Sequence, residues 1–370
     1  MRKRILSLIL VATMTASIFT GCGKGGDSNS NATPTQGATA EEGLWADYKI
    51  DLTKNLSNPN ATDKAQAVYN WLCSIEGKYI ISGQQEKCAD TSNEEFTYIK
   101  GITEELPGLR GLDFINGDYE GVVRRSETWD KFNCLISICW HMGVPGDVDG
   151  GYESSKGTYA GLAEALEDPN SDGYKQIIAD MDLAAEALKD LQEKGIVVLW
   201  RPFHEFDGKW FWWGKGGDAA FVKLWQIMYD RYTNYHGLNN LIWVLGYTGN
   251  ASCGATSWYP GDEYVDIIAA DSYSNTAAEN GYKSMYNILE ERLGDSNKPF
   301  ALHECGKLPK INELKANEIK WLWFLVWHSE YIDNEDINNL ANLSHTYTNE
   351  YVLTMDEMPD FDALMGVSEE

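Results

Sequence analysis

The sequence predicts an α/β fold, a single (β/α)8 barrel of the TIM type, and two observations carry this prediction. Short apolar runs typical of buried strands alternate along the chain with longer amphipathic runs typical of helices. Eight strand-like runs occur, and their alternation with helices implies parallel strands joined by helical crossovers. The chain has 370 residues, enough for one large domain with a substantial core.

The expected strands are short, apolar and followed by polar or aromatic residues. They cover residues 79–82, 109–115, 135–139, 196–200, 241–245, 265–270, 300–303 and 322–326. Amphipathic helices are predicted between them, among them residues 62–75, 174–194, 219–235 and 283–293. In the run 174–194, apolar side chains recur along one stripe, and Gly195 follows as a stop signal.

Two glutamates stand at the ends of expected strands, where barrels of this type carry their catalytic groups. Glu205 follows the fourth strand and Glu304 ends the seventh, so the two can face each other across the barrel mouth. A carboxylate pair delivered from strand ends is the machinery of glycoside hydrolysis. The other strand-end candidates are Gln84, Gln85, Glu86, Asp113, Asp118, Trp140, His141, Arg201, His204, Gly246, Tyr247, Asp271, Tyr273, His303, Trp327 and His328.

Aromatic residues follow the first glutamate directly, in the tract Trp210-Phe211-Trp212-Trp213-Gly214. Aromatic faces pack against the C–H faces of pyranose rings, so such a tract suits a sugar-binding cleft. Candidate platforms are Trp210, Trp212, Trp213, Trp258 and Trp327. We expect at least two of these five to be core residues, and favour Trp210 and Trp327 for the site.

The net charge of the chain limits the classes of molecule that it can be expected to bind. The formal net charge is −26, and no basic run occurs beyond the N-terminus, which disfavours nucleic-acid binding. Strong negative charge also argues against polyanionic substrates and suits a neutral polysaccharide, although an acidic surface that only confers solubility fits equally well. We expect no cofactor, no metal and a monomer.

The N-terminus has the pattern of an export signal. A basic start, Met1 to Arg4, precedes a mostly apolar stretch, residues 5–19, that is too short to span a membrane. The following Phe19-Thr20-Gly21-Cys22 resembles a bacterial lipobox, which implies cleavage before Cys22, lipidation of its thiol and a place on the extracellular face of the membrane. A plain secretory signal is the alternative. Residues 1–22 are thus expected to form the signal, 23–43 a flexible linker and 44–370 the catalytic domain.

The remaining cysteines show no metal-binding or redox spacing. Cys134, Cys139 and Cys305 lie in or beside apolar runs and are expected to be buried thiols. A Cys73–Cys88 bridge stays open.

The segment from Arg201 to Gly214 resembles the RPxHE…WFWWG block of glycoside hydrolase family 26, whose best-known members are endo-β-1,4-mannanases. Supporting segments are Ser82 to Glu86, Ser137 to His141, Asp271 to Tyr273, and Trp327-His328. The resemblance implies a retaining enzyme with Glu205 as acid/base and Glu304 as nucleophile. It also implies that His141, His204, Trp210, Tyr273 and Trp327 surround the reacting sugar.

Three neighbours of the pair have expected tasks. Glu205 needs a raised pKa, and the tryptophan-rich tract beside it can desolvate it. Tyr273 is expected to donate its hydroxyl to Glu304. Arg201 ends an apolar run and is expected to pair with a carboxylate.

Competing interpretations remain. A metal-dependent barrel hydrolase is suggested by His141, His204, His303 and His328, but the first strand lacks the His-x-His that such enzymes carry. A surface glycan-binding lipoprotein without catalysis fits the N-terminus, but binding alone requires neither glutamate. A mixed-linkage β-glucanase or β-xylanase of the same family also stays open, because mannanases often have Met-Asn-Gly where this chain has Phe206-Asp207-Gly208.

Overall fold

A computed structural model describes residues 44–87 and 93–366. The expected signal, Cys22, the linker and Cys88 lie outside the described residues. Strand β1 (Ile80–Gln85) pairs in parallel with both β2 (Leu109–Asp113) and β8 (Trp323–Val326), which closes a barrel of eight parallel strands. The predicted (β/α)8 barrel is therefore confirmed. No helix in the described part of the chain is both long and apolar enough to cross a membrane.

All eight predicted strands are present. The other five are β3 (Leu135–Trp140), β4 (Val198–Pro202), β5 (Leu241–Thr248), β6 (Ile267–Ser272) and β7 (Phe300–Cys305). The fourth strand begins two residues later than predicted, because the backbone N–H of Ile196 still bonds to Leu191 in the preceding helix. A short ninth strand, β9 (Val352–Leu353), pairs with β1 outside the barrel and was not predicted.

Helices follow most strands and pack around the barrel. They are α1 (Asp63–Ile75), α2 (Glu94–Thr103), α3 (Tyr119–Asp130), α4 (Gly151–Ser155), α5 (Leu162–Glu167), α6 (Asp172–Glu193), α7 (Trp212–Lys215), α8 (Asp218–Asp230), α9 (Asn275–Ala278), α10 (Lys283–Leu293), α11 (Ile311–Ala316), α12 (Glu330–Asp333), α13 (Leu340–Tyr347) and α14 (Phe361–Met365). The predicted helix 219–235 divides into α8 and a π-helical turn, Arg231–Tyr235.

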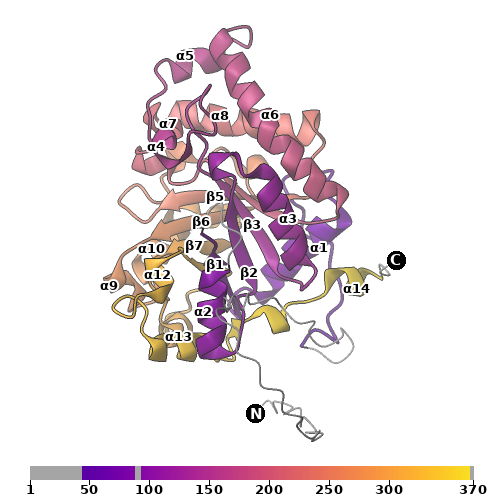
Figure 1. Ribbon diagram of the computed structural model, residues 1–370, viewed down its shortest axis with the longest axis vertical. Helices are drawn as coiled ribbons and strands as arrows, with labels where there is room; N and C mark the ends of the chain where they lie inside the picture. The colour runs from indigo at the N-terminus through magenta and orange to yellow at the C-terminus, as the bar shows by residue number, and fades with distance from the viewer. Residues whose placement is uncertain (1–43, 88–92, 367–370) are drawn as a thin grey trace, which may run out of the picture. The chain divides into compact units, whose positions relative to one another are not determined.

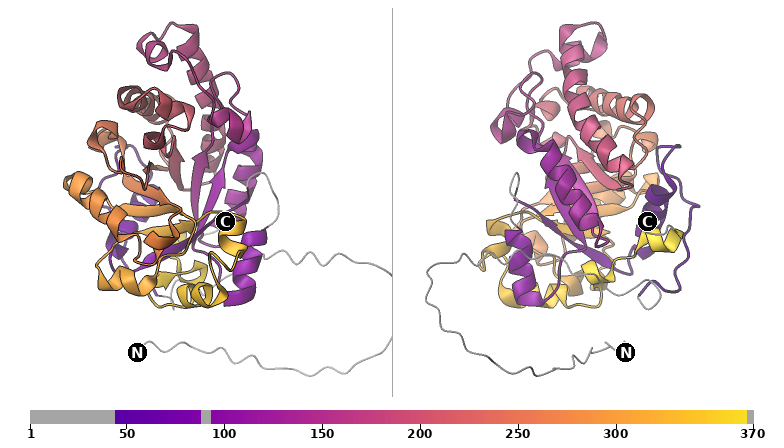
Figure 2. Two further views of the ribbon diagram at one scale, coloured as in Figure 1. Left: turned by 90° about the vertical axis from the view of Figure 1, so that its left-hand side faces the viewer. Right: turned by 45° about the vertical axis from the view of Figure 1, so that its right-hand side comes forward.

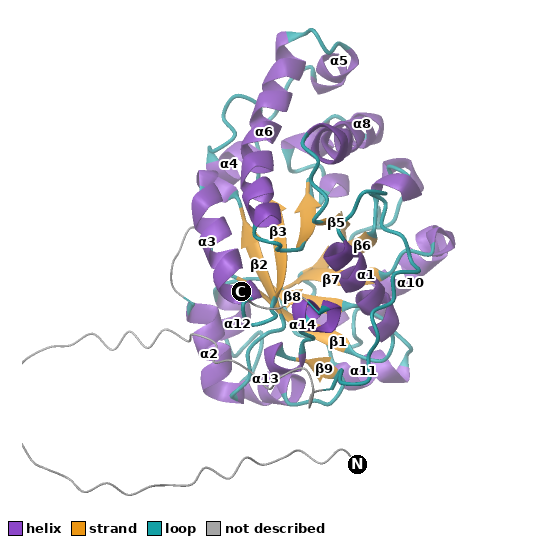
Figure 3. Ribbon diagram, turned by 90° about the vertical axis from the view of Figure 1, so that its right-hand side faces the viewer, coloured by secondary structure: helices purple, strands orange, loops and turns teal. Residues whose placement is uncertain are grey.

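The strands form the inner layer and the helices lie outside them (Figure 3). Helix α3 packs against α6, as Figures 1 and 2 show, and α2 packs against α13 from the far end of the chain. Every strand of the barrel is buried on nearly its whole length, as expected for parallel strands covered on both faces.

The barrel interior is filled by side chains in layers, as is usual for this fold. One buried apolar cluster contains alternate residues of the strands, including Ile81, Leu199, Val244 and Leu325. Among the interior groups is His303, whose Nε2 lies 3.0 Å from the hydroxyl of Ser137 and whose Nδ1 accepts the indole N–H of Trp323 at 3.1 Å. His303 is thus a satisfied core histidine rather than a ligand of an open site.

An irregularity in β7 determines where the second glutamate points. The pairing with β6 shifts between Ala270 and Asp271, so that Asp271 lies opposite Glu304 rather than His303. The pairing with β8 skips in the same region. Successive strand residues normally face opposite sides, and an extra residue in one strand breaks this alternation. His303 and Glu304 therefore both reach the interior of the barrel, the latter at its carboxyl end.

Candidate active site

The two glutamates meet at the carboxyl end of the barrel. Glu304 is buried near the end of β7, and Glu205 is partly buried three residues beyond β4. With Asp271 they form a compact group in which one carboxylate oxygen from each residue lies within 4.8 Å of the others. Carboxyl groups about 5–5.5 Å apart are the arrangement of retaining glycosidases.

Glu304 is held at both of its oxygens. The Arg201 guanidinium donates to Oε1 at 2.8 Å, and the Tyr273 hydroxyl donates to Oε2 at 2.7 Å. Arg201 also pairs with Asp271, whose other oxygen accepts the backbone N–H of Glu304 at 3.1 Å. The expected partners of Arg201 and Tyr273 are thus confirmed, and the Glu304 carboxylate has a fixed orientation.

The loop that carries Glu205 has an unusual backbone. Phe203 and Glu205 have φ values of +51° and +53°, in the left-handed region that side chains other than glycine rarely occupy. The Glu205 N–H donates to the carbonyl of Gly246 in β5 at 2.8 Å. A Cβ at position 246 would lie only 2.8 Å from Nε of Arg201, so glycine is required for this close approach. The loop is thereby locked against the barrel.

The tryptophan tract after Glu205 divides into one open ring and a buried support. The indole N–H of Trp210 donates to Oε2 of Glu205 at 2.9 Å, and 39% of its side chain remains exposed. Trp212 and Trp213 are buried, and their N–H groups donate to the carbonyls of Met142 and His204. The buried tryptophans therefore fix the backbone next to two histidines of the site, while the Trp210 ring stays partly exposed beside Glu205.

The pKa of the Glu205 carboxyl is raised to about 8. Burial is the main cause, and the negative charge of Glu304 adds to it, whereas Arg201 and the indole of Trp210 oppose it. Glu205 is therefore protonated at neutral pH. In such a pair, the protonated carboxyl can act as the acid, and the carboxylate that the arginine holds can act as the nucleophile.

Two histidine rings pack edge to face beside the pair, with 4.6 Å between the ring centroids of His141 and His204. Burial, then the charge of Arg201, lowers the pKa of His204 well below its usual value, so it is neutral. Nε2 of His204 lies 3.9 Å from Oε1 of Glu304. The ring of Trp327 lies 6.0 Å from that of His141, which closes this side of the site.

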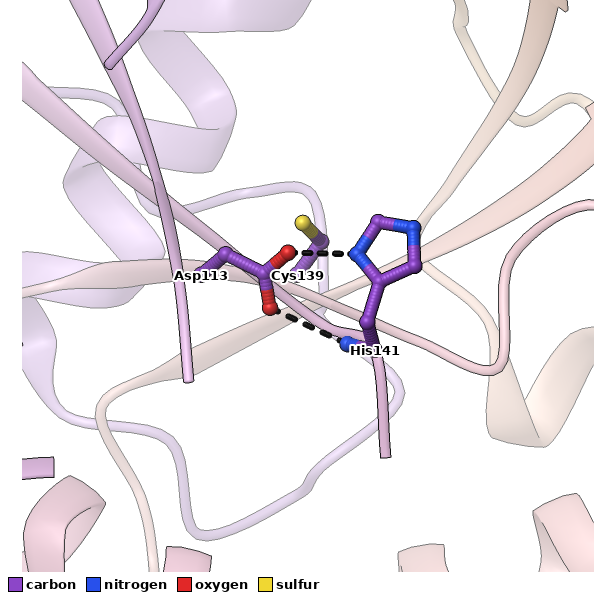
Figure 4. A group of neighbouring side chains, drawn as sticks. All are labelled: Asp113, Cys139 and His141. Atoms are coloured by element: carbon purple, nitrogen blue, oxygen red, sulfur yellow. Dashed lines mark hydrogen bonds and ion pairs between the residues drawn. The ribbon is translucent and has the colours of Figure 1, made fainter. Parts of the chain in front are cut away.

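His141 is paired with a carboxylate that belongs to β2. Oδ2 of Asp113 accepts the His141 Nδ1–H at 2.5 Å, and Oδ1 accepts its backbone N–H at 3.0 Å (Figure 4). Cys139 completes a buried group of three that has the composition of a metal site. The oxygen and nitrogen are hydrogen-bonded directly at 2.5 Å, however, whereas a tetrahedral zinc ion would hold two such ligand atoms about 3.3 Å apart.

The group formed by Glu205, Asp271 and Glu304 also has metal-ligand spacing. Arg201 already supplies a cation there, because its guanidinium contacts both Asp271 and Glu304 and is completely buried. A second cation would have to compete with this fixed charge. Among the described residues these two groups alone have such spacing.

The structure brings together the two glutamates and the five residues expected around the reacting sugar. Glu205, Glu304, His141, His204, Trp210, Tyr273 and Trp327 lie around one site, whereas Trp212, Trp213 and Trp258 are buried. Sequence reasoning missed Tyr152, which is 48% exposed and lies 5.5 Å from the ring of His141. It lies on α4, well beyond the end of β3, and no strand-end rule points to it. The free thiols of Cys134, Cys139 and Cys305 are buried, as predicted.

The sequence is similar to a known family of enzymes and to several of its members. The model of the family described as Glycosyl hydrolase family 26 matches residues 57–357. A "Mannan endo-1,4-beta-mannosidase" of Thermothelomyces thermophilus is 36% identical over 326 residues, which are 83% of this chain and 64% of that protein. The chain thus spans less than two thirds of the length of this curated relative.

Solved structures share the fold over most of the described chain. The GH26-CBM35 β-(1,4)-mannanase of Podospora anserina matches with a TM-score of 0.74 and 35% identity, over 84% of this chain and 70% of that one. A β-mannanase from a symbiotic protist of the termite Reticulitermes speratus, in complex with a gluco-manno-oligosaccharide, has a TM-score of 0.74, 29% identity, and 84% and 98% coverage.

Proposed function

This chain belongs to glycosyl hydrolase family 26, and we propose that it is a retaining endo-β-1,4-mannanase. The observation that carries the proposal is the pair at the barrel mouth. Glu205 is protonated at neutral pH, and one oxygen of its carboxyl lies within 4.8 Å of one oxygen of Glu304, whose carboxylate Arg201 and Tyr273 hold. The short separation supports double displacement, since inverting enzymes leave about 6.5–9.5 Å between the carboxyls to admit water.

In the first step, Glu304 attacks the anomeric carbon and forms a glycosyl ester, while Glu205 gives its proton to the departing glycosidic oxygen. In the second step, Glu205, now a carboxylate, takes a proton from water. The resulting hydroxide attacks the anomeric carbon and releases Glu304. Arg201 and Tyr273 orient the attacking oxygens, and Trp210 holds the Glu205 carboxyl by its indole N–H.

The substrate we propose is a neutral mannan, glucomannan or galactomannan. The similar proteins named above are described as mannanases, and the structure of one of them contains a gluco-manno-oligosaccharide. The strongly acidic chain fits a neutral polymer better than a polyanionic one. Two exposed aromatic residues bond to the glutamates, Trp210 to Glu205 and Tyr273 to Glu304, and their rings offer faces on which sugars can pack.

The test is a reducing-sugar screen across mannan, glucomannan, galactomannan, lichenan and β-1,3-xylan without added metal. We expect fastest cleavage of a mannan-type polymer to short oligosaccharides, with the β-anomer formed first by NMR. Faster cleavage of lichenan or xylan would refute the mannanase proposal. An α-anomer first would remove Glu304 as nucleophile, and no cleavage at all would favour the glycan-binding lipoprotein.

Variants of the pair separate their roles. Glu304→Ala should abolish turnover, whereas Glu205→Ala should slow polymers far more than activated aryl glycosides. Azide should accelerate Glu205→Ala on aryl substrates, because it replaces the water that needs a base. Equal losses on both kinds of substrate would contradict these roles.

We also propose that the enzyme acts as a monomer tethered outside the cell by a lipid on Cys22. The lipobox-like segment before Cys22 supports the lipid anchor. Wild-type protein made in a bacterium that processes lipoproteins should partition with membranes, and Cys22→Ala should prevent this. A wild-type protein found entirely in the culture medium would refute the anchor.

A further inference from the structure

The buried carboxylate of Asp113 fixes both the backbone and the side chain of His141 by hydrogen bonds. Asp113 ends β2 and is completely buried. Its two oxygens both bind His141, one at Nδ1 and one at the backbone N–H, and Oδ1 also accepts the N–H of Ile115 at 3.0 Å. Figure 4 shows the carboxylate facing the imidazole edge. Neither the ring position nor its rotation is free.

The other ring nitrogen of His141 faces the site without a partner. Nε2 forms no hydrogen bond with any residue in the described part of the chain. The ring is bordered by the rings of His204, Phe211, Tyr152 and Trp327, at centroid distances of 4.6, 5.3, 5.5 and 6.0 Å. A polar atom fixed in this place is available to a bound ligand.

We propose that Asp113 is a positioning residue that keeps His141 as an imidazolium, so that Nε2–H donates a hydrogen bond to a hydroxyl of the sugar bound beside the two glutamates. The inference rests on the proposed glycosidase function for the identity of the ligand. The protonation of His141 itself does not depend on it. A neutral His141 that donates through Nδ1 would present Nε2 as an acceptor instead.

The charges around His141 favour the imidazolium. Burial lowers its pKa, but the charge of Asp113, followed by that of Glu304, raises it above the usual value. The pKa of Asp113 is lowered, because His141 and two backbone N–H groups outweigh the effect of burial. Two imidazoles lie nearby, those of His204 after β4 and His328 after β8, and burial together with the charge of His141 lowers the pKa of each. Cys139 on β3 and the phenol of Tyr152 on α4 complete the surroundings.

The two packed histidines therefore differ in charge. The only carboxylate oxygen near His204 is Oε1 of Glu304, at 3.9 Å, and Arg201 already holds it. Burial and the charge of Arg201 therefore move the pKa of His204 down, while that of His141 moves up. Environments that push neighbouring pKa values apart usually assign different tasks to the groups. In Asp113→Asn, the amide oxygen still accepts Nδ1–H, but the negative charge is gone. Burial should then make His141 neutral and turn Nε2 into an acceptor.

NMR titration of the six histidines tests the protonation directly. In the wild type we expect His141 to titrate above pH 6.5, and in Asp113→Asn about 1–3 pH units lower. The matched control is Asp182→Asn, which removes the carboxylate 2.8 Å from Nε2 of the remote His236 and should leave His141 unchanged. A wild-type midpoint at or below 6.5 would overturn the proposal, and this measurement needs neither a variant nor a substrate.

Kinetics on the substrate that the screen identifies tests the function of the pair. Asp113→Asn should lower kcat/KM about 10- to 100-fold at pH 7, the effect of one hydrogen bond from a charged donor. The loss should shrink toward pH 5, where His141 regains its proton. A loss that is the same at both pH values would show a purely structural role and overturn the proposal. Asp182→Asn should match the wild type throughout.

Discussion

Replacing the Glu205 carboxyl by an amide should stabilise the protein, and the gain should grow with pH. The pKa of Glu205 in the folded protein is about 8, against an ordinary value of 4.5. Between these two values the folded state holds a proton that the unfolded state has released. Folding stability therefore falls as pH rises through this window, and Glu205→Gln removes the loss.

The size of the gain follows from linkage. Compared with the wild type, the variant should have a free energy of unfolding that is higher by about 3 kcal/mol at pH 7 and by about 1 kcal/mol at pH 5. For roughly 320 folded residues, the unfolding entropy converts these values to about 5 °C and about 1 °C in Tm. The glutamine side chain can still accept the indole N–H of Trp210, so the contact that positions residue 205 is kept.

The assay is thermal unfolding of the wild type and the variant at several pH values from 5 to 8. Glu186→Gln is the matched control, because Glu186 is exposed on α6, and its Tm difference from the wild type should be small at every pH. A Tm difference for Glu205→Gln that stays constant between pH 5 and pH 7 would refute a raised pKa. A Tm advantage of Glu205→Gln over the wild type that shrinks as pH rises would show that the pKa of Glu205 is lowered in the folded protein rather than raised.

Three other changes probe the site. Tyr273→Phe removes the hydroxyl 2.7 Å from Oε2 of Glu304 and should lower kcat about 10- to 100-fold, with the exposed Tyr235→Phe as an unaffected control. Gly208→Ala places a Cβ 2.2 Å from the Trp210 ring, so it should displace the indole from Glu205 and reduce activity while circular dichroism stays native; full activity would show that the indole contact is dispensable. EDTA should leave the rate unchanged, because Arg201 supplies the positive charge at Glu304, and a rate lost to EDTA and restored by a divalent ion would contradict this.

The barrel could be predicted because its strands are buried on both faces. Such strands appear as continuous apolar runs, and the residue that follows each run is placed at the mouth by the fold itself. Glu205 was found in this way. The exact strand limits could not be predicted, since the N–H of Ile196 bonds backward into the helix instead of forward into the sheet.

The direction in which individual side chains point could not be predicted from the sequence. Simple alternation would place His303 and Glu304 on opposite sides of β7, and only the extra residue seen in its pairing with β6 brings Glu304 to the site. The bond between Asp113 and His141 depends likewise on the register of β2 and β3, in which Asp113 lies opposite Cys139. Register is a property of the folded sheet that a single sequence does not display.

The catalytic end of this barrel is assembled from groups that oppose folding. Phe203 and Glu205 adopt left-handed backbone conformations, which cost on the order of 1–3 kcal/mol each, and Glu205 and Arg201 place ionisable groups out of water. These costs lie in the upper layer and the loop after β4. Elsewhere the interior contains a buried apolar cluster of strand side chains that includes Ile81, Leu199 and Val244. The stability of the barrel therefore resides mainly where the chemistry does not, which is why substitutions at the mouth can abolish catalysis and still leave the fold intact or even strengthen it.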